Sequence, residues 1–212
     1  MKEIAIFGAG GFGREVASLI KRINEKCPTW KFVGFFDDCP SASDNEYGKV
    51  LGNMESLNNL NREMAVVIAV AKPVSIKSIH SRLNNPLLYF PNIIAPEAYF
   101  LDPGNYSLGK GNIISSFTSL SCNVKIGDFN VINNRVSFGH DANIGDYNVF
   151  MTAGRISGNV SIGEGNLFGV GSIVLPGIKI GNNTTVSPGS VIIRPTKDNN
   201  VYIGNPAKIF KV

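Results

Sequence analysis

The sequence holds few of the side chains that form disulfides or bind metals. Among 212 residues there are three cysteines and two histidines. The cysteines, Cys27, Cys39 and Cys122, show neither a CxxC pair nor any metal-ligand spacing, so we expect reduced thiols and a cytoplasmic protein. A zinc site of three histidines is also excluded, because the second half of the chain holds one histidine. We therefore expect no metal.

Runs of positive charge and long apolar runs are also missing. The formal net charge is +4, but the lysines and arginines are scattered, without the interleaved aromatic residues typical of a nucleic-acid-binding surface. No apolar run approaches the length of a membrane span, and the opening MKEIAIFGAG has the pattern of a strand and a glycine loop rather than of a cleavable signal. The composition argues against a nucleic-acid partner and against a membrane span.

The first half of the chain alternates apolar runs with helical patterns. Strand-like runs stand at 4–7, 32–36, 65–71 and 87–90, and helical patterns at 13–23 and 73–83. Strands separated by helices predict βαβ units and a parallel sheet covered by helices. We expect residues 1–96 to form an α/β domain of about four strands, which is half of a dinucleotide-binding Rossmann domain.

From Leu108 onward every sixth residue is apolar. The fifteen positions are Leu108, Ile114, Leu120, Ile126, Ile132, Phe138, Ile144, Phe150, Ile156, Ile162, Phe168, Val174, Ile180, Val186 and Ile192. Ile-Gly pairs recur every 18 residues, so three hexapeptides make one turn. The pattern predicts that residues 97–212 form a parallel β-helix of triangular section, with about four to five coils and these side chains pointing inward. Glycines follow many of the inward positions, where we expect corners that need backbone freedom.

The second half resembles the left-handed β-helix of hexapeptide-repeat acyltransferases, and the ending GNPAKIF at 204–210 resembles the closure of that family. With the glycine loop and the FFDD stretch at 35–38 ahead of it, the chain resembles bacterial amino-sugar N-acetyltransferases and sialic acid O-acetyltransferases. The resemblance covers residues 4–208. It implies an enzyme that uses acetyl-CoA as cosubstrate and a nucleotide-linked amino sugar as acceptor, in a homotrimer with sites between subunits.

Residues 8–13 read GAGGFG and satisfy GxGxxG between a predicted strand and a predicted helix, where backbone N–H groups can hold a phosphate. The loop alone favours NAD, with an acidic residue of the FFDD stretch on a ribose. However, the short domain leaves no room for a second mononucleotide half, so a single nucleotide is the more natural ligand. The resemblance places a nucleotide-linked sugar here, and relatives carry histidine where this chain has phenylalanine. The substrate-binding residues it implies are Gly10, Gly11, Phe12, Asp37, Asp38 and Ala71.

His140 follows an inward position by two residues, so its side chain should leave the prism. A solvated surface histidine is one interpretation. The alternative is a general base, because Asp141 follows directly and could orient the ring. The resemblance implies the base, with aspartate where glutamate is common, and direct transfer without a covalent intermediate. The other histidine, His80, lies in a predicted helix, where we expect a solvated face.

Further residues come from the resemblance alone. It implies that acetyl-CoA lies in a groove between two prisms, with contacts near Gly158, Val170 and Pro188. Lys208 could meet a coenzyme phosphate, although a solvated lysine is equally compatible with the sequence. Asn133 could meet the sugar, or could be a corner asparagine that tolerates a left-handed conformation.

The residues and the resemblance together predict an N-acetyltransferase that acts on a nucleotide-activated amino sugar, specifically a UDP-4-amino-4,6-dideoxy sugar, with His140 as general base. Such an enzyme would serve the synthesis of surface glycans or glycoproteins. Three alternatives stay open: an O-acetyltransferase for a sugar of the sialic acid type, a nucleotide-binding scaffold without catalysis, and a small NAD-dependent enzyme.

Overall fold

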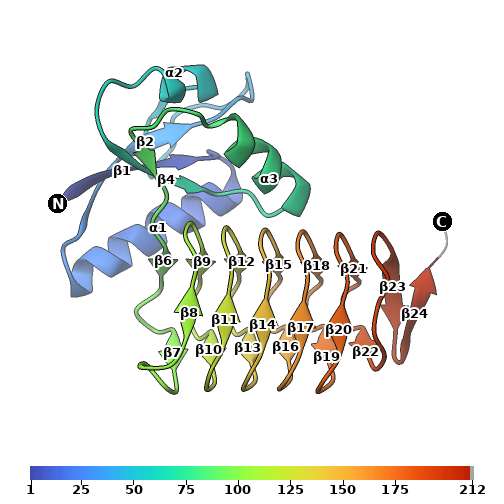
Figure 1. Ribbon diagram of the computed structural model, residues 1–212. Helices are drawn as coiled ribbons and strands as arrows, with labels where there is room; N and C mark the ends of the chain where they lie inside the picture. The colour runs from blue at the N-terminus through green and yellow to red at the C-terminus, as the bar shows by residue number, and fades with distance from the viewer. Residues whose placement is uncertain (211–212) are drawn as a thin grey trace.

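The computed structural model describes residues 1–210 and shows an α/β domain seated on one side of a long triangular prism (Figure 1). The last two residues of the predicted second domain, 211–212, lie outside the described residues. The elements of the first domain are β1 (Lys2–Phe7), α1 (Gly11–Lys26), β2 (Trp30–Phe36), β3 (Val50–Gly52), α2 (Met54–Asn58), β4 (Met64–Ile68), α3 (Pro73–Arg82) and β5 (Leu88–Tyr89).

The sheet of the first domain is parallel, with the strand order β3-β2-β1-β4-β5. It has five strands within the described residues rather than the expected four. The additional strand is β3, whose three residues are too short to give an apolar pattern in the sequence. α1 buries Val16, Leu19 and Ile20 because these apolar residues recur at helical spacing on one face.

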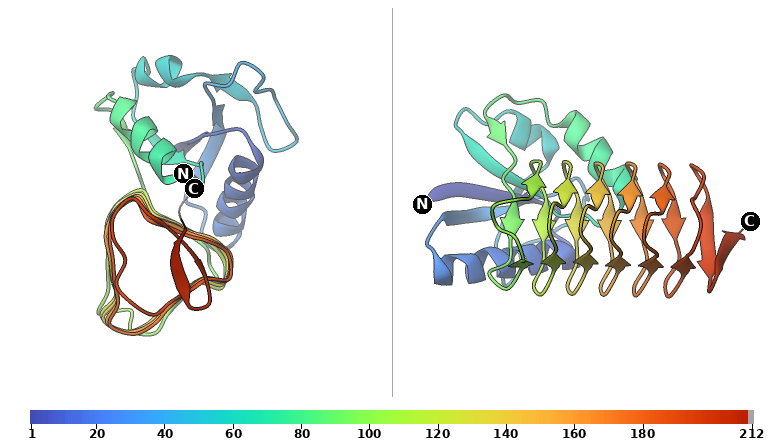
Figure 2. Two further views of the ribbon diagram at one scale, coloured as in Figure 1. Left: turned by 90° about the vertical axis from the view of Figure 1, so that its right-hand side faces the viewer. Right: turned by 60° about the horizontal axis from the view of Figure 1, so that its bottom comes forward.

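Three sheets form the faces of the prism (Figure 2). The β9 face contains β6 (Ile93–Ile94), β9 (Ile113–Ile114), β12 (Val131–Ile132), β15 (Val149–Phe150), β18 (Leu167–Phe168), β21 (Thr185–Val186), β23 (Val201–Gly204) and β24 (Ala207–Phe210). The β10 face contains β7 (Tyr99–Phe100), β10 (Ser119–Leu120), β13 (Ser137–Phe138), β16 (Arg155–Ile156), β19 (Ile173–Val174) and β22 (Val191–Ile192). The β11 face contains β8 (Ser107–Leu108), β11 (Lys125–Ile126), β14 (Asn143–Ile144), β17 (Ser161–Ile162) and β20 (Lys179–Ile180).

The second residue of each two-residue strand of the prism points inward, as the six-residue period predicts. Fourteen of the fifteen predicted inward side chains are buried, and Leu108 at the first coil is half-buried. Strands stack in register at 18-residue intervals, for example Ile126 beside Ile144. The coils begin earlier than expected, at β6, so the strands from β6 to β20 make five complete coils.

Glycines after the inward positions have a different role from the one expected. They do not adopt positive φ; the left-handed residues stand two positions later, as at Asp141 with φ 60°. The glycines are needed for space instead. A Cβ added to Gly139 would lie 2.4 Å from the backbone nitrogen of Gly158 in the next coil. Close stacking of the coils therefore excludes a side chain there.

The outward residues of the three faces explain where the first domain sits. On the β9 face they are apolar: Ile113, Val131 and Val149 are buried and join the core of the first domain in one cluster. On the β11 face the outward Lys125 and Lys179 are exposed. The first domain thus covers the β9 face, because leaving that face in water would expose its apolar residues.

Candidate active site

The His140 side chain stands on the corner between β13 and β14, mostly exposed. Its Nδ1 lies 2.8 Å from Oδ2 of Asp141, while Oδ1 of the same carboxylate accepts a hydrogen bond from Asn123 Nδ2 at 2.7 Å. These two hydrogen bonds lower the pKa of the Asp141 carboxyl below its usual range. An ionised carboxylate only accepts, so Nδ1 carries the proton and the lone pair of Nε2 is free.

The backbone around His140 holds this pair in place. Asp141 adopts a left-handed conformation, and its N–H donates to the carbonyl oxygen of Cys122 at 3.0 Å. The carbonyl oxygen of His140 accepts from Asn159 N–H at 2.8 Å. The ring packs directly on Gly158. A Cβ added to this glycine would lie only 2.5 Å from Nε2 of His140. The ring is therefore seated on a glycine of the next coil, one of the residues expected near acetyl-CoA.

Asn123 was not identified from the sequence as part of this group. Its position is 18 residues before Asp141, which is the length of one coil, so the two residues stack on the same corner. The 18-residue period could have identified Asn123. The same period explains why one coil supplies the histidine and aspartate while the coil before it supplies the amide.

The glycine loop lies at the carboxyl end of β1, as predicted. Gly8 has φ 114°, and a Cβ there would stand 2.7 Å from the carbonyl oxygen of Ala69, so only glycine fits. Next to the loop is a cavity of about 340 Å³ lined by Ala9, Gly10, Arg14, Asp37, Cys39, Ser41, Ala42, Ser43 and Asn45. Ala71 follows β4 at the same edge of the sheet, because β1 and β4 are parallel neighbours.

The two acidic residues predicted to bind the nucleotide already have partners in the protein. Asp37 accepts hydrogen bonds from the N–H groups of Ala9 at 2.7 Å and Cys39 at 2.8 Å. Asp38 accepts from Met54 N–H at 2.9 Å and pairs with Arg82 at 3.3 Å. Asp37 therefore holds the glycine loop against the neighbouring strand, a role that the sequence pattern did not suggest.

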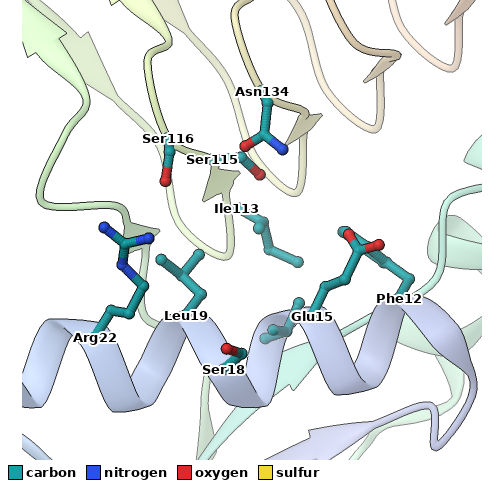
Figure 3. A pocket seen from close by; sticks show the side chains of 10 residues that line it. Phe12, Glu15, Ser18, Leu19, Arg22, Ile113, Ser115, Ser116 and Asn134 are labelled. Carbon is teal, nitrogen blue, oxygen red and sulfur yellow. The ribbon is translucent and has the colours of Figure 1, made fainter.

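A second cavity, of about 230 Å³, separates α1 from the prism (Figure 3). Its wall on the α1 side includes Phe12, and its wall on the prism side includes Asn134. The predicted sugar residue Asn133 stands next to this wall, but its amide donates to the carbonyl oxygen of Phe150 at 3.0 Å. The asparagine whose side chain lines the cavity is therefore Asn134, not Asn133.

The residues expected near acetyl-CoA lie on both edges of the β10 face. Gly158 stands one coil beyond His140 on the corner between the β10 and β11 faces. Val170 and Pro188 stack on the corner between the β9 and β10 faces, in the same column as Asn134. Lys208 lies on β24, where it pairs with Ile203 beyond the last complete coil. The first three therefore border the β10 face, whereas Lys208 lies at the C-terminal end of the β9 face.

The structure does not bring the glycine loop and His140 together within one chain. The first domain rests on the β9 face (Figure 2). His140 stands on the corner between the β10 and β11 faces, which is opposite the β9 face. The loop and the histidine therefore lie on different sides of the same prism.

His80 is not the solvated residue expected from the sequence. Its Nδ1 lies 2.9 Å from the hydroxyl of Tyr147 on the prism, and its ring stacks on Phe129 with centroids 3.9 Å apart. Phe90 packs edge-on against the same ring. The helical pattern of α3 could not show that this face meets the prism, because the contact depends on how the two domains pack.

Among residues 1–210 the structure contains no helix of the length and apolar character needed to cross a membrane. In the same range, no group of three or more histidine, cysteine, aspartate or glutamate side chains is arranged to hold a metal ion.

Two protein-family models match the chain. The model of the PglD N-terminal domain matches residues 3–83, and the model of the bacterial transferase hexapeptide (six repeats) matches residues 159–194. The chain thus carries a PglD-type N-terminal domain followed by bacterial transferase hexapeptide repeats. It is an acyltransferase, and its prism is the left-handed β-helix that the hexapeptide pattern predicts.

Solved structures cover the chain almost completely. WeeI from Acinetobacter baumannii AYE is 28% identical with a TM-score of 0.88, and the match covers 99% of this chain and 100% of that chain. The acetyltransferase domain of PglB from Neisseria gonorrhoeae FA1090, in complex with acetyl coenzyme A, is 25% identical with a TM-score of 0.88 and 99% coverage of both chains. PerB from Caulobacter crescentus, in complex with CoA and GDP-perosamine, is 24% identical with a TM-score of 0.88, covers 100% of this chain and 98% of that chain, and shows the fold alone. A search of curated proteins found no match.

Proposed function

We propose that the protein is an acetyl-CoA-dependent N-acetyltransferase that acts on a nucleotide-linked amino sugar, with a UDP-4-amino-4,6-dideoxy sugar as the expected acceptor. The observation that carries the proposal is the pair of His140 and Asp141, in which Nδ1 is held at 2.8 Å and Nε2 is free. The acetyltransferase domain of PglB, in complex with acetyl coenzyme A, supports the cosubstrate, and PerB, which shares the fold, is in complex with CoA and GDP-perosamine.

In the proposed reaction the neutral sugar amine attacks the carbonyl carbon of the thioester, forming the amide N–C bond. Nε2 of His140 accepts the proton that the nitrogen loses. Asp141 stabilises the resulting imidazolium, because its carboxylate already accepts the Nδ1 hydrogen bond. The C–S bond then breaks, and the coenzyme thiolate takes the proton back from the imidazolium. No covalent enzyme intermediate is needed, in agreement with the absence of a serine or cysteine nucleophile beside His140 in the described hydrogen bonds.

We propose further that the enzyme is a homotrimer whose sites lie between subunits. The separation of the glycine loop from His140 within one chain supports this. A second support is that Asn134, on the wall of the cavity against α1, belongs to the same coil as His140, so both lie at the same height along the prism. A threefold axis parallel to the prism axis relates the subunits without shifting them along that axis. Asn134 of one subunit and His140 of another would therefore lie at the same height, and the loop side of one subunit would meet the histidine of another. Large apolar side chains border the β10 face and are exposed in the single chain: Tyr99, Leu101, Phe117, Val170, Leu175 and Ile193.

We place the proposed enzyme in the cytoplasm, the location expected from the three free cysteines. Asp37 and Asp38 act in this proposal mainly by shaping the nucleotide pocket, because both carboxylates are engaged by the protein. The backbone N–H groups at Gly10 and Gly11 and the start of α1 remain for the diphosphate.

The test is release of the CoA thiol from acetyl-CoA in the presence of a panel of UDP-, GDP- and dTDP-linked amino sugars, with sialic acid as the O-acetylation arm. We expect turnover with an amino sugar and a decrease of about 10²–10⁴-fold in kcat for His140→Ala. Asp141→Asn keeps the left-handed corner and should lower kcat by about tenfold. Turnover of no amino sugar, or wild-type activity in His140→Ala, would refute the proposal. Thermal stabilisation by NAD but not by any nucleotide of the panel would favour the dehydrogenase alternative.

A complementation experiment tests the shared site. Gly10→Glu should fold, since a Cβ at Gly10 has no neighbour within 4 Å, but its carboxylate would repel a diphosphate. Co-expression of Gly10→Glu with His140→Ala should restore about a quarter of the activity if each site takes its loop and its histidine from different subunits. Two inactive variants that stay inactive when mixed would show that the site is not shared.

A further inference from the structure

Two neighbouring residues at the start of α1 lead into two different cavities. Arg14 lines the cavity beside the glycine loop, together with Gly10 and Asp37. Glu15 lines the cavity between α1 and the prism, together with Phe12 and Asn134. In Figure 3 the side chains of Glu15 and Phe12 both rise from α1 toward the prism. The start of α1 thus presents a positive charge to one cavity and a negative charge to the other.

Glu15 supplies the uncompensated charge of the second cavity. The other charged side chain in its lining is Arg22, which forms an ion pair with Glu97. The Glu97 carboxylate also accepts a hydrogen bond from the hydroxyl of Ser116 at 3.0 Å, so this group is internally satisfied. In the part of the chain that the structure describes, the Glu15 carboxylate is in no ion pair. The cavity therefore favours a cationic group with hydrogen-bond donors.

A nucleotide-linked amino sugar has the matching distribution of charge. Its diphosphate is anionic, and its amino group is an ammonium ion in solution near neutral pH. Resting on the proposed function, we infer that Glu15 binds the ammonium form of the acceptor's amino group while Arg14 binds the diphosphate. Phe12 lines the same cavity as Glu15, and its apolar ring suits a deoxy sugar that carries a methyl group.

The position of this cavity fits the proposed transfer step. Asn134 on its wall and His140 belong to the same coil of the prism, so an amino group held there lies at the level of the histidine corner of a neighbouring subunit. The amine must lose its proton before it attacks, and Nε2 of His140 is the proposed acceptor. Glu15 is therefore a binding residue, and its loss should raise KM for the amino sugar more than it lowers kcat.

The experiment measures binding of three probes by calorimetry: UDP, a UDP-4-amino-4,6-dideoxy sugar, and the N-acetylated product, which has no positive charge. If the activity panel selects another nucleotide, the corresponding three compounds are used. Glu15→Gln should weaken binding of the amino sugar by about tenfold, which is the effect of one charge-assisted hydrogen bond, and leave UDP and the product unchanged. The matched variant Arg14→Gln should weaken all three probes by a similar factor.

Two outcomes would overturn the inference. Equal affinity of Glu15→Gln and wild type for the amino sugar would show that the carboxylate does not bind the amine. Equal weakening of all three probes would show that the substitution disturbs the glycine loop instead. Both outcomes leave the proposed function intact if the wild-type enzyme still acetylates an amino sugar, whereas a wild-type enzyme that acetylates none refutes the proposed function itself.

Discussion

The two histidines of the chain have similar hydrogen bonds and opposite surroundings. Nδ1 of His140 lies 2.8 Å from an Asp141 carboxylate oxygen, and Nδ1 of His80 lies 2.9 Å from the Tyr147 hydroxyl. The side chain of His140 is 60% exposed on a corner of the prism. His80 is half-buried between α3 and the prism, stacked on Phe129. The two histidines therefore differ in how exposed they are, not in the length of the contact at Nδ1.

Burial favours the neutral form of the His80 ring. It lowers the pKa of His80, and the charge of Lys110 acts in the same direction. Burial also raises the pKa of Tyr147, followed by the effect of Asp146, so the hydroxyl stays protonated. Two neutral groups suit a packed interface, because neither carries a charge that burial would penalise. At His140 the partner is instead a carboxylate, which stabilises a protonated ring whenever the base accepts a proton.

The largest expected effect comes from breaking the aromatic interface around His80. Phe129 is fully buried and packs against His80, Phe90 and Tyr147. Phe129→Ala should decrease the free energy of unfolding by about 3–5 kcal/mol, since it leaves a cavity between the domains. The control is Val74→Ala, because Val74 is 65% exposed on α3 and is not among the apolar residues that border the β10 face. Chemical denaturation measures the free energy of unfolding of both variants. Equal decreases would contradict the expectation that the buried aromatic interface contributes more to stability than an exposed side chain.

A smaller effect should follow from adding one methyl group beneath His140. Gly158→Ala would place its Cβ 2.5 Å from Nε2, so the ring must turn away and the hydrogen bond to Asp141 should weaken. We expect kcat to fall by about 10- to 100-fold with little change in melting temperature. Gly154→Ala is the matched control, since its Cβ would have no neighbour closer than 3.4 Å. Full activity of Gly158→Ala in the thiol-release assay would show that the ring position is not critical.

The smallest effect should be a pH dependence of stability that belongs to His80. Its pKa in the folded protein is below the usual value near 6.5, so below that pH the unfolded chain binds the proton more readily. The stabilisation is complete above about pH 6.5 and is lost as the pH falls through that value. His80→Gln should remove a decrease of about 2 °C in melting temperature between pH 7 and pH 5.5. An unchanged pH dependence in His80→Gln would show that the dependence does not come from this ring.

Most of the prism could be predicted from the sequence, because each inward position depends on a local six-residue pattern. The corner that carries His140 and Asp141 follows from the same register. Asn123 was missed, although the 18-residue period places it on that corner. The strand β3 was missed because three residues carry no periodic signal. The residue roles expected from the family resemblance stay predictions until the variants are measured.

The sequence by itself determined the glycine loop, the inward side chains of the coils and the outward direction of His140, because these depend on neighbours within one hexapeptide or one βα unit. Only the tertiary structure decided which face of the prism is covered and that His80 of the first domain packs against the prism. It also decided that Asp37 holds the loop through Ala9 N–H at 2.7 Å and that Glu15 opens into a cavity against the prism. These features depend on contacts between residues far apart in the chain, which no local pattern records.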